Sequence, residues 1–337
     1  MEKARLTWID NAKGIGIILV VLGHTYGIPW QLHHIIYSFH MPLFFLLSGY
    51  TFSCDRAREA GVSATVRKLA RAYLVPYFIL AGLNFCGNLV YELYCGSFSP
   101  MQQLRYIAGI LYCYANMTWM PMCSPIWFLP SVFLTKIIYT ALFLRLSRKQ
   151  QHIAAAIFAL LAYGSSVLPI PRLPWNFLPS LFGIFFFHVG TLLRQKELLV
   201  RIRGTRKWLL AIFGAALLCL PLAANNPVGM NENTYGNVAV FLMTSLLYSV
   251  LIMAISPGRK GLLTWFGENS IIFMGFNYLM RAYTVEIYYF IPFVRNYPIH
   301  WMVYFGMTLL SLMAITVFYQ KCVQPRYRKK VTAYEKH

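Results

Sequence analysis

Several ionisable side chains lie inside long apolar stretches of this chain, and they are the residues best placed to do chemistry. Such groups are costly at membrane depth, so they are functional candidates that usually face the interior of a helix bundle. Imidazole is the group best suited to proton transfer among them, because it exchanges a proton near neutral pH. The candidates are His24, His40, Glu92, Lys136, His188 and Glu268.

His24 shares one helical face with Lys13. Lys13 precedes His24 by eleven positions, or about 3.06 helical turns, which places the two side chains roughly 16 Å apart along the axis. Gly16, Gly23 and Gly27 fall on the same stripe. This face could line a slot for an elongated ligand such as coenzyme A, with its phosphates at the cytoplasmic rim and a thioester at mid-membrane. Alternatively, the glycines are helix-packing contacts, Lys13 is a topology anchor and His24 is a buried, hydrogen-bonded residue.

The composition indicates which class of fold must position these groups. Of the 337 residues, 58% are hydrophobic and only 12% are charged, whereas soluble domains carry about a quarter charged residues. The net charge of +20 would suggest nucleic acid in a soluble protein, but here it is read first against a bilayer. We therefore predict an all-α, polytopic integral membrane protein that binds no nucleic acid.

Apolar segments long enough to span a bilayer recur along most of the chain. We predict about ten transmembrane helices, over 14–30, 36–53, 72–94, 125–144, 152–170, 175–193, 208–224, 237–256, 268–284 and 298–320. The first apolar run lacks the cleavage site of a signal peptide.

Basic residues favour an orientation with both termini in the cytoplasm. Lys and Arg in short loops stay on the cytoplasmic side, and this orientation places 25 of the 30 there. The basic surplus is then mostly a topology signal.

Residues 1–337 are predicted to form a single transmembrane domain, without a repeat or linker that would mark a second one. Cys95, Cys113 and Cys123 lie in the longest outward stretch, 95–124, and unpaired thiols are favoured over a disulfide. Their spacing supports no metal site. Asp10 is expected to cap the first helix.

Two N-terminal blocks resemble a known family. They are WIDNAKGIGIILVVLGH over 8–24 and FHMPLFFLLSGY over 39–50. Weaker matches follow in the family's order over nearly the whole chain: Arg67 and Arg71 ahead of Pro76-Tyr77, then 126–129, 185–187 before Gly190, and 267–270. The sequence resembles membrane acyltransferase family 3, and within it the fucose 4-O-acetylase-like branch.

The resemblance implies a ten-span bacterial inner-membrane protein that transfers an acyl group from cytoplasmic acyl-CoA to carbohydrate hydroxyls. His24 matches the essential histidine of the family's Arg-x10-His motif, and Lys13 stands at the arginine position. The lysine keeps the charge but lacks the bidentate fork of a guanidinium. Arg67 and Arg71 match the family's basic pair, where a phosphate site or a topology anchor is expected.

The other matched residues carry more open roles. His40 could orient the acceptor, partner His24, or make a structural hydrogen bond. Trp127 and Phe128 could stack on substrate or belong to an aromatic interface belt. Lys136 is expected to pair with a phosphate or with a carboxylate such as Glu268.

Two further positions concern the ninth span and the core. Glu268 and Asn269 are assigned to substrate binding, but Asn277 replaces a histidine found in many members, which puts an acid/base role of this span in doubt. His188 is expected to be a core or cavity residue.

The combined reading is a membrane-bound O-acyltransferase, with O-acetyl transfer preferred. His24, Lys13 and His40 are its catalytic candidates, and acetyl-CoA is a co-substrate rather than a permanently bound cofactor. The acceptor is an envelope or exported carbohydrate, or a lipid-linked glycan. His24 would act as general base or, in an acyl-histidine relay, as nucleophile. The alternative functions are a proton-coupled transporter or exporter and a non-catalytic sensor module.

Overall fold

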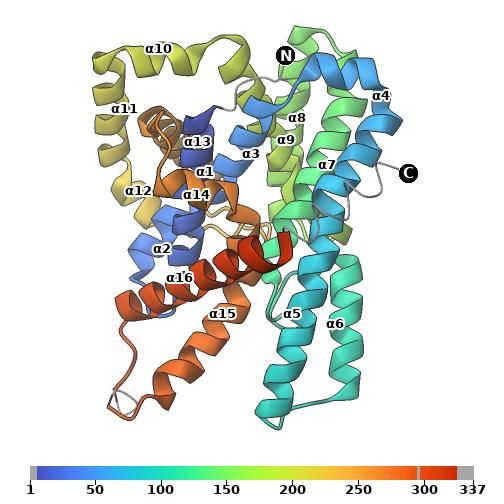
Figure 1. Cartoon of the computed structure of the whole chain (residues 1–337). Coiled ribbons are helices and arrows are strands. Elements are labelled where there is room, and N and C mark those ends of the chain that lie inside the picture. Colours follow the sequence, from blue (N-terminus) through green and yellow to red (C-terminus); the bar gives the residue numbers. More distant parts are fainter. Residues whose placement is uncertain (1–5, 294–296, 325–337) are drawn as a thin grey trace.

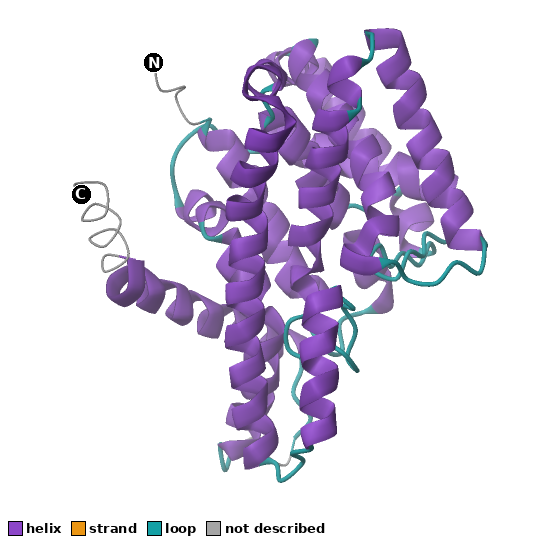
Figure 2. Cartoon of the chain, turned by 90° about the vertical axis from the view of Figure 1, so that its right-hand side faces the viewer, coloured by secondary structure: helices purple, strands orange, loops and turns teal. Residues whose placement is uncertain are grey.

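The computed structural model of the chain is built from helices and loops throughout the residues that it describes, 6–293 and 297–324 (Figure 2). Within these ranges the only strand-like pairing is an isolated bridge between Gly229 and Thr234. The α-helices are α1 (Thr7–Gly23), α2 (Trp30–Tyr37), α3 (His40–Thr51), α4 (Cys54–Leu69), α5 (Val75–Tyr94), α6 (Pro100–Tyr112), α7 (Phe128–Ala141), α8 (Arg148–Val167), α9 (Phe177–Gln195), α10 (Leu198–Gly204), α11 (Arg206–Leu218), α12 (Leu220–Ala224), α13 (Val238–Ile255), α14 (Leu262–Glu268), α15 (Ser270–Phe290) and α16 (Trp301–Phe318).

Five helical segments in the described residues are long and apolar enough to cross a membrane. They are Cys54–Tyr94, Ser124–Arg145, Pro174–Gln195, Val238–Ile255 and Trp301–Val323. The predicted all-α membrane class is therefore confirmed, whereas the count of ten spans stays a prediction.

The N-terminal helices differ from their predicted bounds. The first span was expected over 14–30, but α1 begins at Thr7 and ends at Gly23, so His24 caps the helix instead of lying in its middle. Gly27 adopts a φ of 73° and Pro29 follows it, and both residues stop a helix from continuing. The segment expected over 36–53 is likewise divided, because the chain bends at Ser38 and Phe39 between α2 and α3.

The helix α3 lies in the centre of the bundle, packed against α1, α9 and α13. Its approach to α9 is close because a side chain at Gly49 would collide with the carbonyl of Phe187, and one at Gly190 with that of Leu46. Small residues let two helix backbones approach in this way inside a membrane. This packing fixes α3 against α9, and His40 is the first residue of that helix.

The two ends of the molecule contain different loops (Figure 1). The helices α4 and α10, which occupy the stretches predicted as cytoplasmic over 54–71 and 194–207, lie at the upper end in that view. The helix α6, inside the stretch predicted as outward over 95–124, lies at the lower end beside α5. The two kinds of loop are thus separated as expected, and which end faces the cytoplasm stays a prediction.

Candidate functional site: a histidine cavity and a lysine cluster

His24 and His40 face one small cavity of about 50 Å³. It is formed where the end of α1, the starts of α3 and α7, α15 and the loop before α13 meet. The lining residues are Val20, His24, Tyr37, His40, Met41, Ser124, Pro125, Trp127, Met230, Asn231, Glu232, Met274 and Tyr278. Three residues selected from the sequence, His24, His40 and Trp127, therefore meet at one site.

Both imidazoles are held by their own backbones. Nδ1 of His24 lies 2.6 Å from the carbonyl oxygen of Val20, and Nδ1 of His40 lies 2.9 Å from that of Ile36. A carbonyl only accepts hydrogen bonds, so Nδ1 donates its proton in each ring. In the neutral rings the lone pair is then on Nε2, on the edge turned away from the backbone. A histidine in this state can accept a proton at the cavity.

Aromatic rings surround His24. Its ring centroid lies 5.1 Å from that of Tyr278, 5.6 Å from that of Tyr37 and 6.4 Å from that of His40. Sequence reasoning missed both tyrosines, because nothing in the local pattern separates them from the other 21 tyrosines of the chain. The rings restrict the space beside the imidazole.

Arg281 of α15 fixes the end of α1 on which His24 sits. Its guanidinium donates a hydrogen bond of 2.7 Å to the backbone carbonyl of His24. The same group lies 4.0 Å from the ring centre of Tyr26 and 4.6 Å from that of Tyr278. A cation at the carboxyl end of a helix is favourable, because the last carbonyls of the helix have no intrahelical partner. Arg281 therefore positions His24, a role that the sequence did not reveal.

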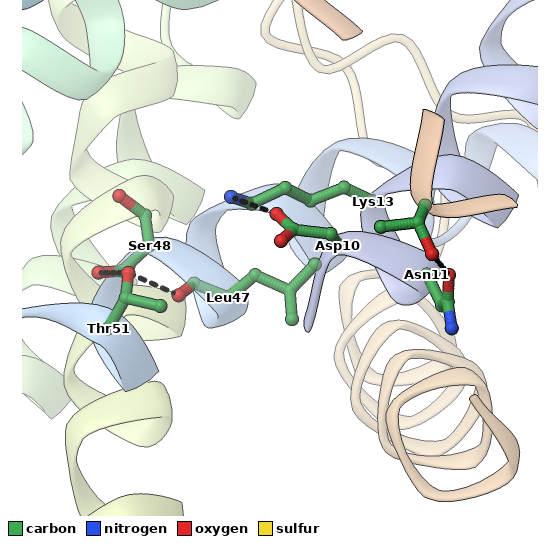
Figure 3. Close-up of polar contacts among 7 residues, drawn as sticks. Asp10, Asn11, Lys13, Leu47, Ser48 and Thr51 are labelled. Carbon is green, nitrogen blue, oxygen red and sulfur yellow. Dashed lines mark hydrogen bonds and ion pairs between the residues drawn. The ribbon is translucent and has the colours of Figure 1, made fainter. Parts of the chain in front are cut away.

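Lys13 lies in a separate polar cluster towards the other end of α3 (Figure 3). Its ammonium is 3.6 Å from the carboxylate of Asp10, and its side chain extends towards the Leu47–Thr51 end of α3. The expectation that Asp10 caps α1 was wrong, because the helix begins three residues earlier and Asp10 lies inside its first turn. A carboxylate at this position still suits the helix dipole.

Lys136 is buried in α7 and contacts Tyr73. Its ammonium donates a hydrogen bond of 2.7 Å to the tyrosine hydroxyl and lies 4.9 Å from the ring centre. Tyr73 belongs to a π-helical turn, Ala70–Leu74, between α4 and α5. The hydrogen-bond partner of Lys136 is thus the phenol of Tyr73, whereas a phosphate or a carboxylate such as that of Glu268 was expected.

A larger cavity of about 370 Å³ lies where α3 ends and α4 begins. Three arginines and one carboxylate line it, together with polar groups from α8 and α9. The whole lining consists of Phe52, Ser53, Cys54, Asp55, Arg58, Arg148, Gln151, Thr191, Arg194 and Gln195. Arg58 is paired with Asp55 at 3.8 Å, and Arg194 donates to the carbonyl of Phe52 at 3.1 Å. Sequence reasoning did not group these basic residues, because they come from three distant segments.

The remaining predicted residues lie away from the histidine cavity. Arg67 and Arg71 are exposed on α4 and the π-helical turn. Phe128 packs against Phe44 and Phe45 in the core. Asn269, beside Glu268 at the junction of α14 and α15, donates to the carbonyl of Trp265.

The glycine stripe on α1 is filled by packing instead of forming a slot. A side chain at Gly16 would meet the rings and methyl groups of Phe44 and Leu43 at 3.1 to 3.2 Å, and one at Gly23 would meet Ile36 at 3.1 Å. The packing interpretation of these two glycines is therefore the correct one.

His188 and Glu92 belong to closed hydrogen-bond networks. Nδ1 of His188 is 3.0 Å from the hydroxyl of Tyr139, and its Nε2 is 2.9 Å from Nδ1 of His152. The buried carboxylate of Glu92 accepts hydrogen bonds from Asn88, Gln103 and Tyr106, which join α5 to α6. Both groups connect neighbouring helices.

The cysteines of the 95–124 stretch are free thiols, as favoured from their spacing. Among the described residues, no group of three His, Cys, Asp or Glu side chains could hold a metal ion.

A family model described as an acyltransferase domain, that of acyltransferase family 3, matches residues 6–318 of the chain. No curated protein and no solved structure gave a significant match. The match covers both the histidine cavity and the polar cluster around Lys13 and Asp10.

Proposed function

Because the chain belongs to acyltransferase family 3, we propose that it is a membrane-bound O-acyltransferase with His24 as the general base. The acyl group, acetyl by preference, comes from acyl-CoA and is placed on a carbohydrate hydroxyl. The observation that carries the proposal is that His24 lines the cavity while its Nδ1 is tied to the carbonyl of Val20, which makes Nε2 the basic nitrogen of the ring.

Acyl transfer from a thioester to a hydroxyl needs a base and the exclusion of water. Nε2 of His24 takes the proton of the acceptor hydroxyl while the hydroxyl oxygen attacks the carbonyl carbon of the thioester. The carbon–sulfur bond then breaks, and the thiolate takes the proton back from His24. The aromatic rings of Tyr37 and Tyr278 restrict the space beside His24, which limits the access of competing water.

His40 supports the reaction from the same cavity, where its ring centroid lies 6.4 Å from that of His24. Its Nε2 is free to contact the acceptor hydroxyl or the imidazole of His24, because its Nδ1 is tied to Ile36. Trp127 offers a flat ring at the same cavity for the acyl group or the sugar.

The basic groups at the other end of α3 suit the phosphates of acyl-CoA. Lys13 lies three residues after Asp10 in α1, and Lys136 is a buried cation whose hydrogen-bond partner is the phenol of Tyr73. Such a charge gains stability from an anionic ligand. Arg67 and Arg71 add positive charge on the side from which the donor would enter.

The proposal extends to the setting of the enzyme. The N-terminal blocks favour the fucose 4-O-acetylase-like branch, a bacterial inner membrane, about ten spans and cytoplasmic termini. The acceptor would then be an envelope or exported glycan, or its lipid-linked precursor.

Labelled acetyl-CoA supplied to native membranes tests the proposal. Wild-type protein should transfer label to glycan, and His24→Ala should reduce the transfer by about 10²- to 10⁴-fold, the contribution of a general base. Unchanged transfer by His24→Ala would refute the assignment. If label is trapped on the wild-type protein but not on the variant, His24 acts as the nucleophile of an acyl-histidine relay and not as a general base. Glycan movement across the membrane without acyl-CoA would favour a transporter.

A further inference from the structure

The histidine cavity is too small to contain a sugar ring. Its volume of about 50 Å³ compares with the roughly 30 Å³ that one water molecule occupies in the liquid. If a sugar hydroxyl reacts at His24, the rest of the acceptor must lie in space that adjoins this cavity.

A second cavity adjoins it and shares two of its residues. Asn231 and Glu232, in the loop between α12 and α13, line both cavities. The second cavity has a volume of about 180 Å³ and lies between this loop, the end of α8 and the start of α9. A ligand seated there would lie beside the residues that border the histidine cavity.

The lining of the second cavity has the chemistry that recognises a carbohydrate. Hydroxyl, carboxamide and carboxylate groups line it, among them Ser165, Asn176, Glu232 and Thr234, beside an apolar wall that includes Leu168 and Leu178. Carboxamides both donate and accept, and a carboxylate accepts from hydroxyl groups. The aliphatic wall suits the C–H face of a sugar ring. Polar groups placed on an apolar wall are typical of small-molecule sites.

Hydrogen bonds hold this lining in place. The guanidinium of Arg172 donates to Oδ1 of Asn176 at 3.0 Å and to the carbonyl of Asn231 at 2.9 Å. Asn231 in turn donates to the carbonyl of Ala115 at 2.6 Å, and Asn233 donates to the hydroxyl of Ser165 at 3.0 Å. A site held in this way loses little freedom when it binds a ligand.

We infer that this second cavity is the acceptor subsite, which holds the ring of a hydroxyl-rich carbohydrate while one hydroxyl reaches His24 past Asn231 and Glu232. The inference rests on the proposed acyltransferase function. Because the lining carries one cation, Arg172, and one carboxylate, Glu232, its formal charges offset each other, and the acceptor ring is a neutral sugar rather than an acidic one.

Filling the subsite tests the inference. Ser166 lies at the end of α8, where Ser166→Trp places an indole into the second cavity. The matched control is Leu160→Trp on the same helix, at a side chain that is 68% exposed. Both variants are compared with wild type in native membranes that contain the acceptor glycan, with labelled acetyl-CoA. Label in the glycan, the KM for acetyl-CoA and the melting temperature are measured.

We expect Ser166→Trp to lose at least about tenfold in glycan labelling, with the KM for acetyl-CoA within about twofold of wild type and an unchanged melting temperature. Leu160→Trp should label glycan normally. Glu232→Gln, which keeps the shape of the side chain, should also lower labelling without changing the KM for acetyl-CoA.

The outcomes separate the inference from the proposed function. Absence of glycan labelling by wild type would overturn both. Normal labelling by Ser166→Trp, beside a wild type that needs His24, would overturn the subsite alone. A loss accompanied by a raised KM for acetyl-CoA or a lowered melting temperature would also overturn it, because the damage would then lie in the donor site or the fold.

Discussion

His24 and His188 both stand in apolar helical surroundings, and in both rings Nδ1 is hydrogen-bonded to an oxygen. The rings differ at the second nitrogen. Nε2 of His188 contacts His152, whereas that of His24 is left for a cavity that His40 also lines. His188 joins α9 to α7 and α8, while His24 ends a helix whose last carbonyl is held by Arg281.

The difference shows that residue type and burial do not by themselves make a histidine reactive. A ring with both nitrogens engaged cannot take a proton without breaking a hydrogen bond, which costs about 1 to 3 kcal/mol when the partner is buried. A ring with one nitrogen anchored and the other open is oriented without that cost. The anchor also selects the tautomer.

The strongest contrast should come from the same substitution at the two histidines. His24→Gln is expected to lower acyl transfer by about 10²- to 10⁴-fold because it removes the base. His188→Gln should lower it less than about tenfold and should instead reduce stability, because Tyr139 and His152 lose their partner. Transfer assays and thermal unfolding in detergent measure the two effects. Equal losses of activity at both sites would abolish the contrast.

Removing the support of His24 should have the next largest effect. Arg281→Met deletes the hydrogen bond to the His24 carbonyl, and a displaced base reduces the rate by up to about 10²-fold. The loss should appear in kcat, with the KM for acetyl-CoA nearly unchanged. Arg281→Lys should recover part of the rate, since it restores a cation at the helix end. A loss confined to KM would show that Arg281 binds the donor instead.

The closed network should respond in stability and not in turnover. Tyr139→Phe removes a hydroxyl that lies 3.0 Å from His188 and 3.1 Å from the hydroxyl of Thr191. Because these partners are buried, the free energy of unfolding should fall by about 1 to 3 kcal/mol. Specific activity per folded molecule should stay within about twofold, and a larger drop would place this network in the reaction.

The smallest effect is expected at the edge of that network. His152 is exposed, so His152→Ala leaves Nε2 of His188 near solvent that can replace the lost contact. The free energy of unfolding should change by at most about 1 kcal/mol, as for other surface substitutions. Acyl transfer should be unaffected in the same membranes. A stronger effect on transfer would connect His188 to a proton path.

Sequence reasoning predicted the helical membrane class and the family, because these depend on composition and on contiguous motifs, and it selected His24 by its place in one of those motifs. It failed at the ends of the first two helices, where Gly27, Pro29 and the bend at Ser38 override a hydrophobic pattern. It also left open whether the glycine stripe forms a slot or a packing surface, and Phe44 and Tyr37 fill it. The packing partner of a glycine cannot be read from its own helix.

The sequence alone determined that this chain is a helical membrane protein, since too few residues are charged for a soluble fold, and that His24 stands in an apolar stretch. Only the tertiary structure decided what His24 can do. Its neighbours Tyr278, Arg281 and Glu232 lie more than 200 residues away along the chain, and Nε2 borders a cavity only because α1, α3 and α15 meet there. The reactivity of a side chain depends on the groups that surround it, and helix packing brings those groups together from distant segments.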